Sequence, residues 1–208
     1  MTTALILVDL QNDFMPGGAL AVATGDETVA IANALIPDYK LVVATQDWHP
    51  TDHGSFATNH PGAKVFDVVD LNGLDQVLWP VHCVQETHGA AFQAELHADR
   101  IDRVFPKGMD PGTDSYSGFF DNGKRRATGM GDWLREQGIT EIDVMGLAMD
   151  YCVKFTAIDG AGLGFATRLV LPGCRAVNLN PGDDDQAIAA MKAAGVTIQT
   201  DLPGLLGS

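Results

Sequence analysis

The sequence predicts an α/β protein in which helices cover both faces of a mostly parallel sheet. Short apolar runs rich in β-branched residues recur along the chain, and segments with helical spacing separate them. Strands that alternate with helices form parallel sheets, because each crossover places a helix on one face of the sheet. The chain of 208 residues is expected to form a single domain, 1–208, since one core can grow to roughly 250 residues before it splits.

The expected elements follow from these runs. The strands span residues 4–8, 41–45, 101–105, 141–147, 167–171 and 196–200. The helices span residues 27–36, 88–97, 130–138, 150–163 and 184–194. Residues 47–83 and 106–128 are rich in Gly, Pro, His and Asp and show little periodicity. Long irregular segments in a compact domain are usually functional or disordered, and the aromatic and ligand-type residues in these two favour function.

Composition and charge exclude several classes of protein. A hydrophobic fraction of 46% is too high for a disordered chain. The formal net charge of -14 repels phosphate backbones and anionic lipid surfaces, so we expect neither nucleic acid nor a membrane as a partner. No apolar run approaches the roughly 20 residues of a transmembrane helix, and the first residues lack the basic start of a signal peptide. We therefore expect a cytoplasmic location.

Cys152 is the candidate nucleophile. The segment VMGLAMDYCVKFTAIDG places it where a predicted strand gives way to a helix. Unpaired amides and the positive end of the helix dipole favour a thiolate there, and the amides of Ala148 and Cys152 could stabilise an oxyanion. The alternative for Cys152 is a buried apolar cysteine, which we expect for Cys83 and Cys174. The sequence contains no CxxC pair, which argues against a disulfide framework.

Two charged residues stand at the ends of other predicted strands. Asp9, in ILVDLQNDF, could take the Cys152 proton and return it to a leaving amine. Lys107, in FPKGMD, could hold a positive charge between thiolate and carboxylate. The alternatives are a turn or capping role for Asp9 and a solvated surface position for Lys107. Open parallel sheets bind ligands beyond the carboxyl ends of their strands, so we expect the three side chains to share one rim.

A candidate metal site follows the second predicted strand. The segment ATQDWHPTDHGSF contains Asp47 and His49, and WPVHCVQ supplies His82 from a separate loop. Two histidines and a carboxylate suit Zn²⁺, Fe²⁺ or Mn²⁺ bound as a Lewis acid, whereas the alternative is a merely solvated loop. The spacing leaves open whether His53 is a fourth ligand or an outer partner. The remaining histidines lack such a context and are expected to be structural: His60, His88 and His97.

The chain resembles the nicotinamidase/pyrazinamidase branch of the isochorismatase-like cysteine hydrolases. The strings that carry the resemblance are, in order, VDLQNDF, QDWHPTDHGSF, WPVHCVQ, KGMDPGTDSYSGFFDNG and MGLAMDYCVKFTAIDG. Each string alone is weak to moderate, whereas their order and spacing span nearly the whole chain. The resemblance implies a three-layer α/β/α fold around a six-stranded parallel sheet. It also implies hydrolysis of nicotinamide, and by extension of pyrazinamide, to the carboxylic acid and ammonia in NAD salvage.

Residue roles also follow from the resemblance. It matches three residues to the family's base, lysine and nucleophile: Asp9, Lys107 and Cys152. It matches three more to the ligands of a metal, Zn²⁺ as the first choice, that would bind the pyridine nitrogen: Asp47, His49 and His82. Phe14 and Trp79 match aromatic walls of the pocket, and Ala148 matches an oxyanion donor next to a cis peptide. One departure is Met149, where the family more often carries threonine and where turn geometry or substrate range could change.

Several alternatives stay open. A related hydrolase on this scaffold could act on maleamate, ureidoacrylate, an N-carbamoyl compound or isochorismate, but the resemblance ties the DWH loop to a pyridine nitrogen. A non-catalytic binding domain should have lost a triad residue, and none is lost. A hydrolase that attacks with metal-bound hydroxide would leave Cys152 incidental and should tolerate alkylation. The resemblance leaves a monomer and a homo-oligomer equally open.

Overall fold

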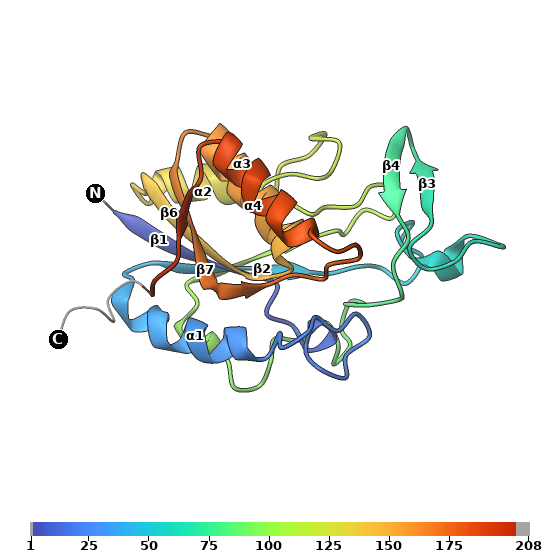
Figure 1. Cartoon of the computed structure of the whole chain (residues 1–208), viewed down its shortest axis with the longest axis horizontal. Coiled ribbons are helices and arrows are strands. Elements are labelled where there is room, and N and C mark those ends of the chain that lie inside the picture. The colour runs from blue at the N-terminus through green and yellow to red at the C-terminus, as the bar shows by residue number, and fades with distance from the viewer. Residues whose placement is uncertain (1, 203–208) are drawn as a thin grey trace.

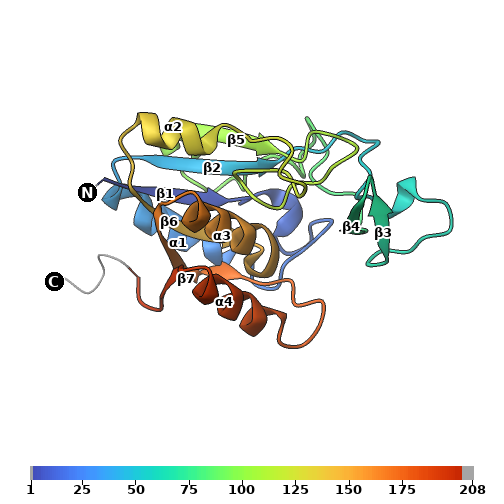
Figure 2. The same ribbon diagram turned by 90° about the horizontal axis from the view of Figure 1, so that it is seen from above.

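A six-stranded sheet in the order β5-β2-β1-β6-β7-β8 forms the centre of the computed structural model, which describes residues 2–202. Its strands are β1 (Thr3–Val8), β2 (Val42–Asp47), β5 (Arg103–Lys107), β6 (Glu141–Leu147), β7 (Ala166–Arg175) and β8 (Thr197–Gln199). All neighbouring strands pair in parallel. One face is covered by α1 (Glu27–Leu35), and the other by α2 (Met130–Glu136), α3 (Lys154–Gly162) and α4 (Asp183–Ala193) (Figures 1 and 2). The predicted three-layer α/β fold is confirmed.

The strand β1 lies in the middle of the sheet because every side chain from Ala4 to Val8 is apolar and fully buried. From β1 the chain adds β2 and then β5 on one side, and it crosses back to place β6 on the other side. The carboxyl ends of β1 and β6 therefore flank the point where the winding direction reverses. Open α/β sheets bind their ligands at such a point. None of the described helices is long and apolar enough to cross a membrane.

The helix predicted for residues 88–97 is wrong. The backbone N–H of Asn12 donates to the carbonyl of Ala91 at 3.0 Å, and the N–H of Gln93 donates to the carbonyl of Leu10 at 2.9 Å. These bonds use donors and acceptors that a helix would pair internally, so the segment runs as turns beside the loop after β1. Tertiary contacts override the helical spacing there.

The helix predicted for residues 150–163 begins differently from an α-helix. A π-helical turn, Met149–Val153, precedes α3. The N–H groups of Tyr151 and Val153 both donate to the carbonyl of Ala148, each at 3.1 Å. Turns of this kind are rare and are often found at functional sites. The buried Met149 opens this turn, so the departure from the family pattern lies in the same turn as the candidate nucleophile, three positions before it.

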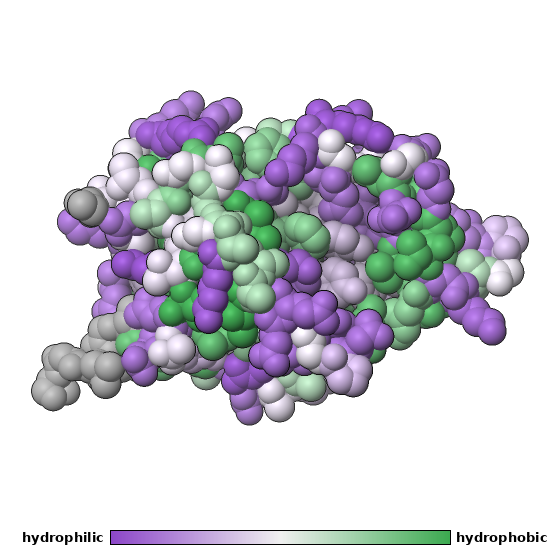
Figure 3. Space-filling model, turned by 45° about the horizontal axis from the view of Figure 1, so that its top comes forward, coloured by the Kyte–Doolittle hydropathy of each residue, from purple (hydrophilic) through white to green (hydrophobic). Residues whose placement is uncertain are grey.

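Part of the irregular stretch 47–83 forms a hairpin that sequence reasoning missed. The antiparallel strands β3 (Val68–Leu71) and β4 (Leu74–Val77) are joined by Asn72 and Gly73, both with positive φ, as tight hairpin turns favour. The hairpin projects beyond the end of the main sheet (Figure 1). This part of the surface carries an apolar patch (Figure 3), and the exposed large apolar residues in and just before the hairpin are Val65, Phe66 and Val68.

An ion pair between a buried carboxylate and a partly exposed arginine lies toward the amino-terminal edge of the sheet. Arg168 on β7 donates to both oxygens of Asp143 on β6, at 2.5 and 2.8 Å. The Tyr39 hydroxyl donates to the same carboxylate, which is fully buried. Bidentate arginine–carboxylate pairs are strong and directional, so this cluster fixes β6 against β7 at the edge opposite to the predicted site.

Candidate active site

Asp9, Lys107 and Cys152 meet at the carboxyl-terminal edge of the sheet. Asp9 follows β1, Lys107 ends β5, and Cys152 lies in the π-helical turn after β6. The Lys107 Nζ lies 2.9 Å from Asp9 Oδ2 and 3.3 Å from Cys152 Sγ. All three residues are buried, Lys107 with 2% of its surface exposed, which overturns the alternative of a solvated lysine. The lysine therefore stands between the carboxylate and the thiol.

Lys107 has two further acceptors. It donates to the Asp47 carboxylate and, at 3.0 Å, to the carbonyl of Ser115. The contact with Asp47 follows from strand register, because Asp47 and Lys107 are direct partners in the pairing of β2 with β5. Both strands extend further than predicted, so both residues belong to the sheet rather than to the loops that follow. The Lys107 ammonium thus contacts both Asp9, which the sequence analysis predicted to be a base, and Asp47, which it predicted to be a metal ligand.

Burial sets the protonation of this cluster. It raises the pKa of the Cys152 thiol well above its ordinary value, with Lys107 opposing. It also raises the pKa of Asp9, with Lys107 opposing and Asp47 adding to the rise. Burial works against a charged Lys107, but Asp47 and Asp9 outweigh it and raise the lysine pKa well above its usual range. Burial therefore opposes the thiolate at Cys152, whereas Lys107 favours it.

Thr45 completes the surroundings of Asp9. Its hydroxyl donates to Asp9 Oδ1 at 2.6 Å, and this bond lowers the pKa of the carboxyl against the effect of burial. Thr45 lies on β2, and its side chain lies on the same face of the strand as that of Asp47, two positions along. Sequence reasoning missed this residue, since a threonine is common in a buried strand and gives no distinct signal.

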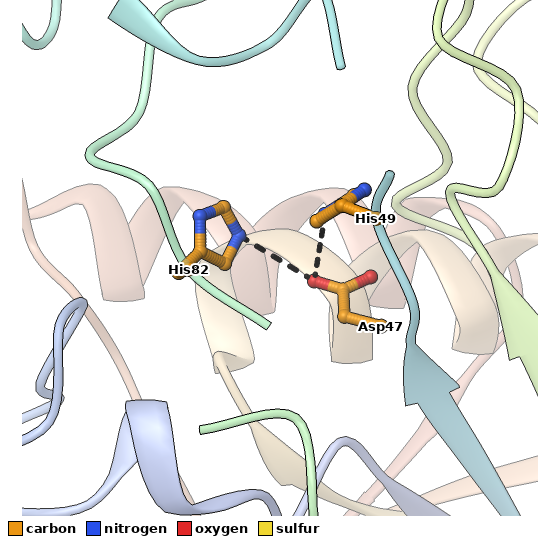
Figure 4. Close-up of side chains that lie close together, drawn as sticks. All are labelled: Asp47, His49 and His82. Carbon is orange, nitrogen blue, oxygen red and sulfur yellow. Dashed lines mark ion pairs between the residues drawn. The ribbon is translucent and has the colours of Figure 1, made fainter. Parts of the chain in front are cut away.

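The side chains of Asp47, His49 and His82 point toward one another (Figure 4). Asp47 Oδ2 lies 3.6 Å from His49 Nε2 and 3.7 Å from His82 Nε2, and all three residues are buried. The Nδ1 atoms lie 2.8 Å from the carbonyls of Gly108 and Pro80, respectively. A carbonyl only accepts, so Nδ1 carries a proton, and Nε2 is the ring atom that faces Asp47. Metal-binding histidines are held in this way, and the donor set suits a divalent ion.

His53 lies beside His49 rather than within this group of three. The two ring centroids are 4.2 Å apart. The N–H of Ser55 donates to His53 Nδ1 at 3.2 Å, and burial, with His49 adding to it, lowers the pKa of the ring to about 4. The Ser55 hydroxyl lies 2.7 Å from the same nitrogen, and Nε2 is buried without a hydrogen-bond partner among the described residues. His53 also groups with His49 and Asp114, so its place as a fourth ligand or an outer partner stays open.

A cavity of about 30 Å³ adjoins Cys152. The predicted wall residues Phe14, Trp79 and Ala148 all line it, and the peptide bond before Ala148 is cis. The lining residues that sequence reasoning missed are Leu20, Asp114, Tyr116, Tyr151 and Val177. Tyr116 could have been found from its place in the motif DSYSGFF, and Tyr151 from its place next to Cys152 in the sequence. Nothing in the sequence marks the other three residues as lining the cavity.

The chain is similar in sequence and fold to several known proteins. The family model described as "Isochorismatase domain" matches residues 3–201. A nicotinamidase of Escherichia coli (strain K12) is 52% identical over 202 residues, which cover 95% of this chain and 94% of that protein. The structure of a nicotinamidase/pyrazinamidase of Acinetobacter baumanii superposes with a TM-score of 0.92 at 42% identity and covers 95% of each chain. A pyrazinamidase of Pyrococcus horikoshii in complex with zinc has a TM-score of 0.78 at 35% identity, covering 97% of this chain and 100% of that one.

The resemblance inferred from the sequence strings is thus confirmed by a match along nearly the whole chain. The solved relatives share the fold of this chain as well as its sequence. Because these relatives are named as amide-cleaving enzymes, the alternative of a non-catalytic binding domain loses its support. The chain belongs to the isochorismatase family and is an amidohydrolase.

Proposed function

We propose that the protein is a nicotinamidase, which hydrolyses nicotinamide, and also pyrazinamide, to the carboxylic acid and ammonia. The observation that carries this proposal is that His82, one of three convergent metal-type ligands, and Cys152 line the same cavity between aromatic walls. The names of the relatives from E. coli and A. baumanii support the choice of amide. The free acid would then enter NAD salvage. We place the activity in the cytoplasm, where buried free thiols such as those of Cys83 and Cys174 stay reduced.

Asp9, Lys107 and Cys152 would carry the proton transfers and the bond formation. Asp9 takes the proton from the Cys152 sulfur, and Lys107 stabilises the resulting thiolate. The sulfur attacks the carboxamide carbon, and the backbone N–H groups of Ala148 and Cys152 receive the oxyanion. When the oxyanion collapses, Asp9 gives its proton to the leaving nitrogen and ammonia departs. Asp9 then takes a proton from water, which hydrolyses the thioester to the acid and the free thiol.

Asp47, His49 and His82 would hold a divalent ion, with Zn²⁺ as the first choice and Fe²⁺ or Mn²⁺ as alternatives. The ion would supply a Lewis acid for the pyridine nitrogen and so orient the carboxamide. The fit rests on the two Nε2 atoms that face the Asp47 carboxylate. The zinc complex of the P. horikoshii relative supports this choice of metal.

Ammonia release from nicotinamide tests the proposal. We expect the purified protein to release ammonia, to lose at least about 100-fold of its rate after chelation, and to recover when Zn²⁺, Fe²⁺ or Mn²⁺ is returned. His49→Ala should behave like the chelated protein, whereas His88→Ala, which changes an exposed histidine, should match the wild type. If none of the metals supports release while maleamate or a carbamoyl amine is cleaved, the pyridine assignment is wrong and the cysteine chemistry stands.

Thr45→Val is expected to shift the pH dependence of kcat/KM. The Thr45 hydrogen bond stabilises the charged form of Asp9 and lowers its pKa, so its loss raises that pKa. Asp9 then becomes a base only at higher pH, and the acid limb of the profile should move up by about one to two pH units. Thr167→Val is the matched control, because the buried Thr167 hydroxyl bonds the carbonyl of Phe165, away from the site. An unmoved acid limb would argue against Asp9 as the base.

A further inference from the structure

Asp150 is a buried carboxylate that takes no part in the proton transfers described above. It lies within the π-helical turn, two positions before Cys152, with 2% of its surface exposed. One oxygen accepts the backbone N–H of Val177 at 2.9 Å, and the other accepts the N–H of Asn178 at 2.8 Å. Charge-assisted bonds to both oxygens make a directional tether. Asp150 therefore ties the turn of the candidate nucleophile to the loop between β7 and α4.

The tethered loop contributes a wall of the cavity. Val177 lines it, together with Phe14 and Cys152. Asn178 has a left-handed backbone with φ of 51°, and its side-chain oxygen accepts the N–H of Asp184 at 2.9 Å in the first turn of α4. The loop is thus held by Asp150 on the side of the cavity and by α4 on the side of the solvent.

The size of the cavity makes the position of this wall important. Its volume of about 30 Å³ is small, so the Val177 wall has a large influence on what fits beside Cys152. The two hydrogen bonds to Asp150 limit how far Val177 withdraws. We propose that Asp150 is a positioning residue that sets the width of the cavity through Val177, and that Val177 is a specificity-determining residue for groups on the substrate ring. Only the identity of that ring rests on the proposed function.

Alkylation of Cys152 in the full metal-loaded protein measures this width without a substrate. The rate constants for iodoacetamide and for its bulkier N-phenyl derivative are followed by mass spectrometry of the peptide that contains Cys152. Both reagents attack the same thiolate, so the ratio of their rates cancels any change in the ionisation of the thiol. The ratio reports the room around the sulfur.

We expect Val177→Ala and Asp150→Asn each to raise the rate of the N-phenyl reagent relative to iodoacetamide by about 10-fold or more, as one missing methylene does in a tight apolar pocket. The double variant should exceed Val177→Ala by little, since both changes act on one wall. Asp159→Asn is the matched control: Asp159 is also buried and near Cys152 in sequence, but it pairs with Lys124 and does not line this cavity. Its ratio should equal that of the wild type.

A second arm compares kcat/KM for nicotinamide with that for nicotinamides that carry a single ring methyl group. The preference for the unsubstituted ring should fall in the Val177 and Asp150 variants by about the same factor. A lowered melting temperature in Asp150→Asn with an unchanged alkylation ratio would assign it a merely structural role and overturn the proposal. Additive effects in the double variant would separate Asp150 from Val177 and overturn it as well. Failure of the proposed function would instead show as no nicotinate release by the wild type, while the alkylation ratios still decide on the tether.

Discussion

Cys152→Ala should reduce ammonia release from nicotinamide by at least about 10⁴-fold, because nothing else in the cavity supplies a nucleophile that forms a thioester. The residue that replaces cysteine is smaller and apolar, and the Asp9–Lys107 ion pair of 2.9 Å stays in place. Binding of nicotinamide, measured by calorimetry, should therefore remain within a few-fold of the wild type. The expected result is a protein that binds its substrate and does not turn it over.

Cys174→Ala is the matched control for this experiment. Cys174 is buried to nearly the same degree, 5% exposed against 7% for Cys152, but it lies on β7 and does not line the cavity. The Cys174→Ala variant should lose some stability and keep the wild-type rate of ammonia release. Retained turnover in Cys152→Ala would refute the nucleophile assignment and favour attack by metal-bound hydroxide, in which the cysteine is incidental.

Lys107→Met should lower the free energy of unfolding by about 3–5 kcal/mol, because it leaves buried carboxylates without their cation. Asp9 and Asp47 are both buried, and both contact the Lys107 ammonium. Methionine preserves most of the side-chain volume, so packing contributes little to the loss. Chemical denaturation of the metal-free protein near neutral pH measures the effect. The loss should shrink at acid pH, where the carboxylates become neutral.

Lys124→Met shows what the removal of a partly exposed ion pair costs. Lys124 lies 2.6 Å from Asp159, and its side chain is 66% exposed although that of Asp159 is only 8% exposed, so its loss should cost about 1–2 kcal/mol, less than the loss of Lys107. A Lys107 variant that is no less stable than the Lys124 variant would mean that Asp9 and Asp47 are not both charged in the folded protein. The same comparison applied to ammonia release should leave Lys124→Met active and Lys107→Met inactive.

Much of the candidate site was predictable because parallel strands bring their carboxyl ends together. Asp9, Asp47, Lys107 and Cys152 each end or follow a strand, so apolar runs alone were enough to place them at one edge. Apolar runs do not reveal which residues stand opposite each other. The register that pairs Asp47 with Lys107 arises from the packing of whole strands, and the link between Asp9 and the Asp47–His49–His82 group depends on it.

Features that depend on contacts distant in sequence were not predictable. Residues 88–97 have helical spacing, yet their backbone pairs with the loop after β1. The dipeptide Asn72–Gly73 is typical of a hairpin turn between β3 and β4, but the flanking residues do not alternate clearly enough to indicate two strands. Val177 reaches the cavity while Asp150, 27 positions earlier, holds its loop, and no spacing rule reports such a bond.

The strand β6 keeps a group of stabilising residues apart from the residues of the candidate active site. Its Asp143 belongs to the ion pair with Arg168, and its far end leads to Cys152, roughly 13 Å or more away at about 3.3 Å per residue. The residues around the Asp143–Arg168 pair, which stabilise the sheet, therefore do not contact the residues around Cys152. Libraries for thermal tolerance can be confined to the neighbours of Asp143, and libraries for new amides to the neighbours of Cys152, and the gains from each should combine additively.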